Sequence, residues 1–199
     1  NREEYERLLE AAHRNGRIQL YYILQTLCAT GIRVGELQYI TVEALTSGRA
    51  IARNKGKSRV ILIPSVLCTM LRNYAAENGI STGPVFISKY GNPVDRSNIW
   101  RGMHRLCQAA EVGEEKVYPH NLRHLFARTF YQKEKDITHL ADILGHQNVN
   151  TTRIYVVSSG EEHRAQIEAL GLAIPQDTSQ SATLKAQHND ILCCTWDDI

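Results

Sequence analysis

The chain has 199 residues, 43% hydrophobic and 22% charged, the proportions of an ordinary globular protein, which exclude a disordered or fibrous chain. No apolar run approaches the roughly 20 residues that cross a bilayer, and no signal peptide opens the chain, so we expect a cytoplasmic protein without a membrane partner. The net charge of +2 leaves nucleic-acid binding open, because the grouping of the basic residues decides it.

The five cysteines are scattered along the chain. The adjacent pair Cys193-Cys194 lacks the CxxC spacing of a redox or zinc site. We therefore expect reduced thiols, as in a cytosolic protein, and neither a bound metal nor another cofactor.

The first part of the chain has helical spacing, followed by a β-hairpin pattern. Helices are predicted over residues 3–14 and 18–29, the second ending at Gly31, and residues 34–40 begin another. Strands are then predicted at 49–53 and 59–63 around a short turn.

The rest of the chain is again mostly helical. Residues 85–87 predict a third short strand between turn residues. Helices are predicted from Ser65, over 97–110 with Trp100 facing inward, over 121–131, and over 136–144. The sum is a mainly α domain with a small antiparallel β-sheet, an α+β fold.

Cations stand at two predicted helix starts, where the helix dipole disfavours them. Arg33 follows the turn in ATGIRVGEL, and His120, Arg123 and His124 share one face at the start of the helix in PHNLRH. Either an internal carboxylate, with Glu36 a candidate for Arg33, or a bound phosphate would relieve the repulsion, since guanidinium groups grip phosphate oxygens in pairs. On these residues alone the two alternatives stay equal.

The segment LGHQNVNTTRIY favours the phosphate. His146 follows a helix stop at Gly145, and Tyr155 comes nine positions after His146. A phenol is a poor nucleophile at its usual pKa near 10, but it can attack a phosphate whose charge two arginines neutralise.

These boxes resemble those of the tyrosine recombinases, also called the phage integrase family. The matching motifs are TGIRVGEL, the HxxR box in PHNLRH, the histidine-then-tyrosine box LGHQNVNTTRIY, and the hairpin NKGKSR, which is similar to the family's lysine-bearing turn. The resemblance covers residues 3–170. Four motifs in the family's order make a specific signal.

The resemblance implies the following roles. Tyr155 would attack the scissile DNA phosphate, forming a 3′-phosphotyrosyl bond and releasing a 5′-hydroxyl, while Arg33 and Arg123 would clamp the non-bridging oxygens. His120 would position the phosphate and handle the tyrosine proton. His146 would donate a further hydrogen bond.

Further roles fall on the hairpin and on neighbours of these residues. Lys55 would protonate the leaving oxygen, with Lys57 as the alternative, since this turn is a residue shorter than in the chromosome-dimer-resolving relatives. Glu36 would hold Arg33 without touching DNA. Three residues would contact DNA: Lys57, Arg59 and His124.

The same residues allow rival interpretations. A zinc site of His120, His124 and His146 is disfavoured by Arg123 between the first two, and by the missing Glu of HExxH. A type IB topoisomerase uses similar chemistry, but the HxxR and LGH boxes favour a recombinase. A non-catalytic DNA-binding module of the same fold would not need the intact tyrosine and arginines.

The resemblance also implies an organisation and a biological setting. We expect a catalytic domain at residues 1–172 and a tail at 173–199, either exchanged between protomers or folded back on its own domain, with the family's N-terminal core-binding domain absent from this chain. The partner would be duplex DNA at recombination sites, bound by a homotetramer that is monomeric when free. The wording of the boxes favours a bacterial mobile-element integrase over an Xer-like resolution recombinase.

Overall fold

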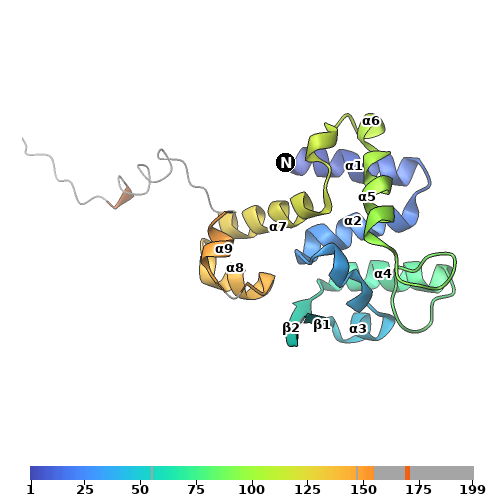
Figure 1. Ribbon diagram of the computed structural model, residues 1–199, viewed down its shortest axis with the longest axis horizontal. Helices are drawn as coiled ribbons and strands as arrows, with labels where there is room; N and C mark the ends of the chain where they lie inside the picture. The colour runs from blue at the N-terminus through green and yellow to red at the C-terminus, as the bar shows by residue number, and fades with distance from the viewer. Residues whose placement is uncertain (55, 147, 155–168, 171–199) are drawn as a thin grey trace, which may run out of the picture. The chain divides into compact units, whose positions relative to one another are not determined.

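The computed structural model describes residues 1–54, 56–146, 148–154 and 169–170. The chain divides into two units, Asn1–Val157 and Ser158–Ile199, and the fold described here is that of the first (Figure 1). The predicted domain boundary at residue 172 lies outside the described residues. Among the described helices, none is both long and apolar enough to cross a membrane.

The two predicted opening helices are confirmed. Helix α1 spans Arg2–Arg14, with Asn1 and Glu4 forming a capping box, and α2 spans Ile18–Thr30 and ends at Gly31 in the left-handed conformation. The predicted third helix is a 3-10 helix, η1, over Val34–Tyr39, because its backbone bonds join residues three apart, such as Glu36 N–H to the Arg33 carbonyl at 2.8 Å.

The predicted hairpin is confirmed as the two-stranded antiparallel sheet. Helix α3, Val42–Ser47, leads into β1, Arg49–Asn54, which pairs with β2, Lys57–Leu62. The alternation of the strands puts Ala50, Ala52 and Ile61 in the core, while Ile51, Val60 and Leu62 are exposed.

The predicted third strand is wrong for the described residues. Residues 84 and 87 form isolated bridges with Thr41 and Pro93, and no strand is added to the hairpin there. The segment's backbone groups instead pair with two separate parts of the chain: Val85 N–H donates to the Ile40 carbonyl at 2.9 Å, and the Phe86 carbonyl accepts from Val94 N–H at 3.1 Å.

The remaining predicted helices begin within two residues of their predicted starts, and one of them is divided in two. The predicted helix over 97–110 is broken at Arg105-Leu106 by a bond of Leu106 N–H to the Met103 carbonyl at 3.0 Å. Trp100, predicted to face inward, is 40% exposed. The helices are α4 Ser65–Glu77, α5 Arg96–His104, α6 Cys107–Ala110, η2 Glu114–Lys116, α7 Pro119–Glu134, α8 Ile137–Leu144 and α9 Asn150–Arg153.

Two apolar clusters hold these elements together. The main core surrounds α2, whose Leu24 and Leu27 are fully buried, and a smaller cluster joins α7 to α8 through Ala127, Leu140 and Leu144. Helix α7 lies along α2 (Figure 1). The mainly α fold with a small antiparallel sheet is thus confirmed.

Gly31 sets how closely α7 approaches the end of α2. Its φ of +62° favours glycine, and a Cβ there would lie 2.4 Å from Cδ1 of Phe126. The end of α2 and the first half of α7 can therefore meet only without a side chain at this position.

We predict that Gly31→Ala destabilises the protein more than Gly16→Ala. Both glycines have positive φ, but nothing lies within 4 Å of a Cβ at Gly16, so only Gly31→Ala adds a steric clash to the backbone strain. The expected losses in the free energy of unfolding are about 1 kcal/mol at Gly16 and ~2–4 kcal/mol at Gly31. Urea unfolding measures both, and equal losses would contradict the close packing.

Candidate active site

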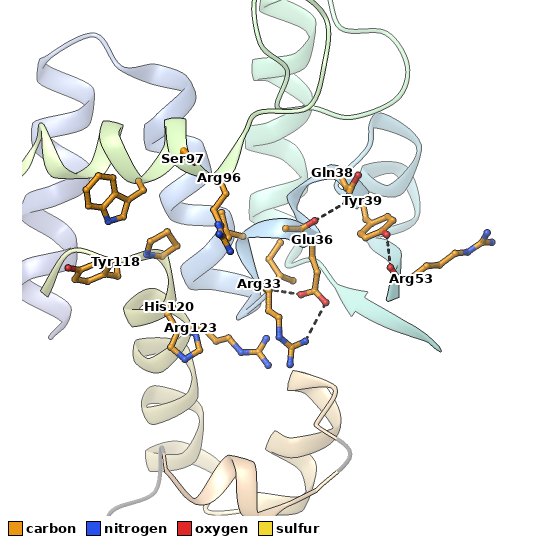
Figure 2. Close-up of a pocket in the computed structure, with 15 residues that line it drawn as sticks. Arg33, Glu36, Gln38, Tyr39, Arg53, Arg96, Ser97, Tyr118, His120 and Arg123 are labelled. Atoms are coloured by element: carbon orange, nitrogen blue, oxygen red, sulfur yellow. Dashed lines mark hydrogen bonds and ion pairs between the residues drawn. The ribbon is translucent and has the colours of Figure 1, made fainter. Parts of the chain in front are cut away.

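Several cationic side chains line one cavity, of about 820 Å³, between η1, the start of α5 and the start of α7 (Figure 2). Of the predicted site residues, Arg33, Glu36, His120 and Arg123 line it. Glu36 is the one carboxylate among the lining residues that the structure describes. Such an excess of positive charge favours an anionic ligand.

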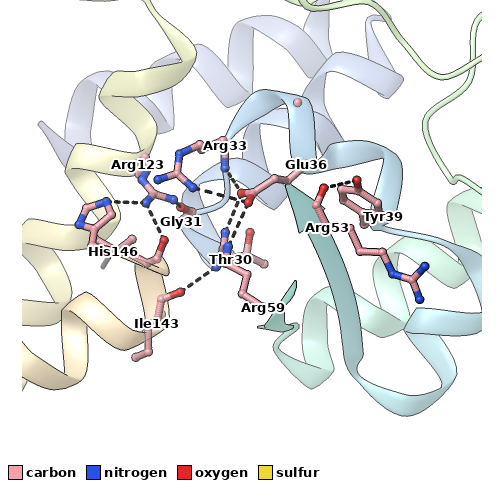
Figure 3. A network of polar contacts seen from close by, with 12 residues as sticks. Thr30, Gly31, Arg33, Glu36, Tyr39, Arg53, Arg59, Arg123, Ile143 and His146 are labelled. Carbon is pink, nitrogen blue, oxygen red and sulfur yellow. Dashed lines mark hydrogen bonds and ion pairs between the residues drawn. The ribbon is translucent and has the colours of Figure 1, made fainter. Parts of the chain in front are cut away.

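Arg123 is a buried charge, 1% exposed, that joins three parts of the chain (Figure 3). Its Nη1 donates to the Gly31 carbonyl at 2.6 Å, and its Nη2 donates to the Leu144 carbonyl at 2.8 Å and lies 2.9 Å from Nε2 of His146. These contacts fix the guanidinium at the meeting point of α2, α7 and α8. The two carbonyls that accept from it are neutral groups.

Arg33 reaches the same place from the other side, and its side chain remains 44% exposed. The Glu36 carboxylate holds it, accepting the Arg33 backbone N–H at 2.7 Å and lying 3.7 Å from Nη1. In Figures 2 and 3 the guanidinium groups of Arg33 and Arg123 lie next to each other. The two arginines predicted to clamp one phosphate are thus brought together.

Glu36 has a second partner, Arg59 of β2. The carboxylate accepts from Arg59 Nε at 3.0 Å and from Nη2 at 2.6 Å, a bidentate pair in which Glu36 is 8% and Arg59 16% exposed. Burial raises the pKa of the Glu36 carboxyl, but the hydrogen bonds from Arg59 and the Arg33 backbone outweigh it, so the pKa lies below its usual value. The side chain predicted to contact DNA, Arg59, is engaged here inside the protein.

His146 is held neutral beside these cations. Burial, then the charges of Arg123, Arg33 and Arg59, lower its pKa to about 4. Because a guanidinium can only donate, Nε2 of His146 accepts from Arg123, and Nδ1 then carries the proton toward Thr152 Oγ1, 2.9 Å away. Thr152 on α9 is fully buried, so it orients the imidazole from the side away from Arg123.

His120 and His124 occupy successive turns of α7, their rings nearly perpendicular with centroids 4.7 Å apart. His120 lines the cavity, whereas His124 is half-buried behind it. Burial and the charges of Arg123 and Arg33 lower the pKa of His120, so this ring too is neutral near pH 7. A neutral imidazole can accept a proton.

Two predicted catalytic residues, Lys55 and Tyr155, lie outside the described residues. Lys57 begins β2 and pairs with Asn54 across the turn. Helix α9 and Ile154 lead directly to position 155. The roles predicted for these residues stay predictions.

Other residues of the cavity were not predicted from the sequence. Arg53 near the hairpin turn and Arg96 at the first position of α5 add charge, and Trp100 and Tyr118 add partly exposed rings. Arg96 carries the signal that marked Arg33, a cation at a helix start. Among the described residues no group of three or more His, Cys, Asp or Glu side chains could hold a metal ion.

We predict that the free energy of unfolding falls as the pH is lowered from about 6.5 toward 4. In that range the unfolded chain binds a proton at position 146 that the folded protein, with its pKa of about 4, does not. Urea unfolding of His146→Gln should show a weaker pH dependence, because one contributing group is lost. The pKa values of His120 and His124 are lowered as well, so these two residues retain part of the pH dependence in the variant. The control is His13→Gln, on α1 and outside the cavity. If the pH dependence of the free energy of unfolding were the same in His146→Gln as in the wild type, this environment of His146 would be contradicted.

Comparison with known proteins identifies the family of the chain. A model of the phage integrase family matches residues 1–162. Tyrosine recombinase XerH of Campylobacter jejuni is 32% identical over 165 residues, 78% of this chain and 47% of the relative. Tyrosine recombinase XerC of Halalkalibacterium halodurans is 30% identical over 169 residues, 77% of this chain and 55% of the relative. The chain spans about half the length of these curated relatives.

Solved structures share the fold. XerA recombinase matches with a TM-score of 0.70 and 28% identity, over 88% of this chain and 63% of that one. XerH bound to its difH substrate before cleavage matches with a TM-score of 0.68 and 25% identity, over 82% of this chain and 51% of that one. From the extent of the family match and the shared fold, the chain belongs to the phage integrase family, that of the tyrosine recombinases.

Proposed function

We propose that the protein is a site-specific DNA recombinase that cuts and rejoins strands through a 3′-phosphotyrosyl intermediate at Tyr155. The observation that carries this proposal is the convergence of Arg33 and Arg123 on one cavity, beside the segment that bears His146 and leads to residue 155. Relatives with the same fold are named recombinases, and one was solved bound to its DNA substrate.

In the proposed reaction the phenol oxygen of Tyr155 attacks the scissile phosphorus. The bond from phosphorus to the 5′-oxygen breaks, and Lys55 supplies the proton that the departing oxygen takes. Neutral His120 accepts the phenol proton. The charge that develops on the non-bridging oxygens meets Arg33 and Arg123, whose positions are fixed before DNA arrives.

The covalent ester explains how strands can be rejoined without ATP. A phosphotyrosyl bond replaces one phosphodiester by another of similar energy, so attack by a 5′-hydroxyl reverses the reaction. The arginines supply the positive charge that Mg²⁺ provides in many other phosphoryl-transfer enzymes.

The biological setting has two candidates. The sequence boxes favour integration and excision of a mobile element, whereas the Xer names of the relatives favour resolution by an Xer-like recombinase. In either case we propose duplex DNA as the substrate and four protomers on two duplexes as the active assembly. The tail predicted to be exchanged, residues 173–199, lies outside the described residues.

We predict that Tyr155→Phe abolishes a covalent protein–DNA adduct that the wild type forms. The substrate is a pool of nicked duplexes randomised around the nick. After cleavage the short strand that bears the 5′-hydroxyl diffuses away, so the phosphotyrosyl ester cannot be reversed and accumulates. The adduct is detected as a band that resists denaturation. Tyr90→Phe, at a tyrosine 77% exposed outside the cavity, should leave the adduct unchanged.

An adduct that persists in Tyr155→Phe would contradict the assignment of the nucleophile, and no adduct from the wild type would remove the catalytic proposal. Sequencing the DNA on the adduct then separates the two settings: a selected sequence that matches the ends of a mobile element supports integration, and one that matches a single chromosomal site supports resolution.

A further inference from the structure

We infer that Arg59 is a positioning residue that locks the Arg33 loop to the segment bearing His146, rather than a residue that contacts DNA. Arg59 lies on β2, far in sequence from both parts that it joins. Its guanidinium uses both edges: Nε and Nη2 face Glu36, and Nη1 donates to the Ile143 carbonyl at 2.8 Å (Figure 3).

The first edge reaches Arg33 through one carboxylate. Oε2 of Glu36 accepts both Arg59 Nη2 at 2.6 Å and the Arg33 backbone N–H at 2.7 Å. Oε1 accepts Arg59 Nε and lies 3.7 Å from Arg33 Nη1. A shift of Arg59 would therefore move the carboxylate that orients both the backbone and the side chain of Arg33.

The second edge completes the end of α8. An α-helix leaves its last four carbonyls without intrahelical partners. Here the backbone N–H groups of Gly145 and His146 satisfy Asp142 and Ala141, while Arg59 satisfies Ile143 and Arg123 satisfies Leu144. Two guanidinium groups thus hold adjacent carbonyls, two residues or fewer before Gly145-His146.

The surroundings leave room for this side chain. A Cβ at Gly145 would lie 2.4 Å from Cδ of Arg59, and the cross-strand partner of Arg59 is the small Ala52. Arg59 also shares the inward face of β2 with Ile61, which is 1% exposed. The position therefore directs the guanidinium into the protein, where Glu36 takes up its charge.

This inference rests on the proposed function and predicts how cleavage is altered. Loss of the Arg59 contacts frees the Arg33 loop and the His146 segment from each other, so the phosphate clamp loses its geometry. A misplacement of about 1 Å in a catalytic group can slow a reaction about 100-fold. DNA binding, in contrast, should keep its affinity, because Arg59 offers its charge to Glu36.

The test compares Arg59→Lys and Arg59→Met with the wild type on a nicked duplex selected from the randomised pool. Arg59→Lys keeps the charge beside Glu36, but an ammonium cannot form the bidentate pair and reach the Ile143 carbonyl as well. Arg49→Met, on the exposed side of the neighbouring strand, removes an equal charge as control. The measurements are the adduct rate at saturating DNA, the affinity across salt concentrations, and circular dichroism.

We expect both Arg59 variants to form adduct about 10- to 100-fold more slowly at saturating DNA, with the salt dependence of binding unchanged and Arg49→Met cleaving at the wild-type rate. If Arg59→Met unfolds, Arg59→Lys decides.

A wild-type rate in Arg59→Lys would overturn the inference. So would normal cleavage at saturating DNA together with weaker binding whose salt slope falls by about 0.9, which is the signature of a lost phosphate contact. A wild-type protein that forms no adduct removes the proposed function itself, and this inference with it, so the two failures are distinguishable.

Discussion

The candidate site depends on which groups donate hydrogen bonds to the last four backbone carbonyls of α8. Two of its last carbonyls are capped by backbone N–H groups, and the other two accept from Arg59 and Arg123. The negative end of the helix dipole therefore faces two positive side chains, which is the favourable arrangement. Because these arginines come from β2 and α7, one helix end draws together the hairpin, the α2–α7 pair and the segment that continues to His146.

The two arginines that meet α8 differ in what happens to their charge. Arg59 is paired with Glu36, so its positive charge is largely neutralised inside the protein. The carbonyl partners described for Arg123, those of Gly31 and Leu144, are neutral, as is the imidazole of His146, and they hold its guanidinium in place. Together with exposed Arg33, this makes a rigid cationic corner that needs little rearrangement to receive an oxyanion.

Much of the fold, in particular where its helices begin and end, could be predicted from local sequence signals. Gly31 and Gly145 end helices in the left-handed conformation because glycine has no Cβ to disfavour it, and Asp136 caps α8 as its position predicts. Residues 85–87 have strand propensity but form only isolated bridges and single backbone hydrogen bonds, because propensity does not determine whether a partner strand is available. The break at Arg105-Leu106 lies between residues of regular helical spacing, and both Leu106 and Cys107 are buried there.

The candidate site likewise contains residues that the sequence predicts and residues that it does not. The resemblance of the motifs predicted one site for Arg33, Glu36, His120 and Arg123, and all four line one cavity. The charge of Arg59 alone does not show whether this side chain contacts DNA or is engaged inside the protein. Its position two residues before buried Ile61 on β2 was a usable signal, because residues two apart on a strand share one face. Trp100 and Tyr118 line the cavity for reasons of packing that helical periodicity alone does not contain.

The most direct measurement of the central claim is the position of a bound oxyanion in crystals of the protein soaked with tungstate, located by its anomalous scattering. The account predicts a peak within hydrogen-bonding distance of the guanidinium groups of both Arg33 and Arg123, lost in Arg123→Gln. A strong peak at Arg53 or Arg96, with the space between Arg33 and Arg123 vacant, would contradict it.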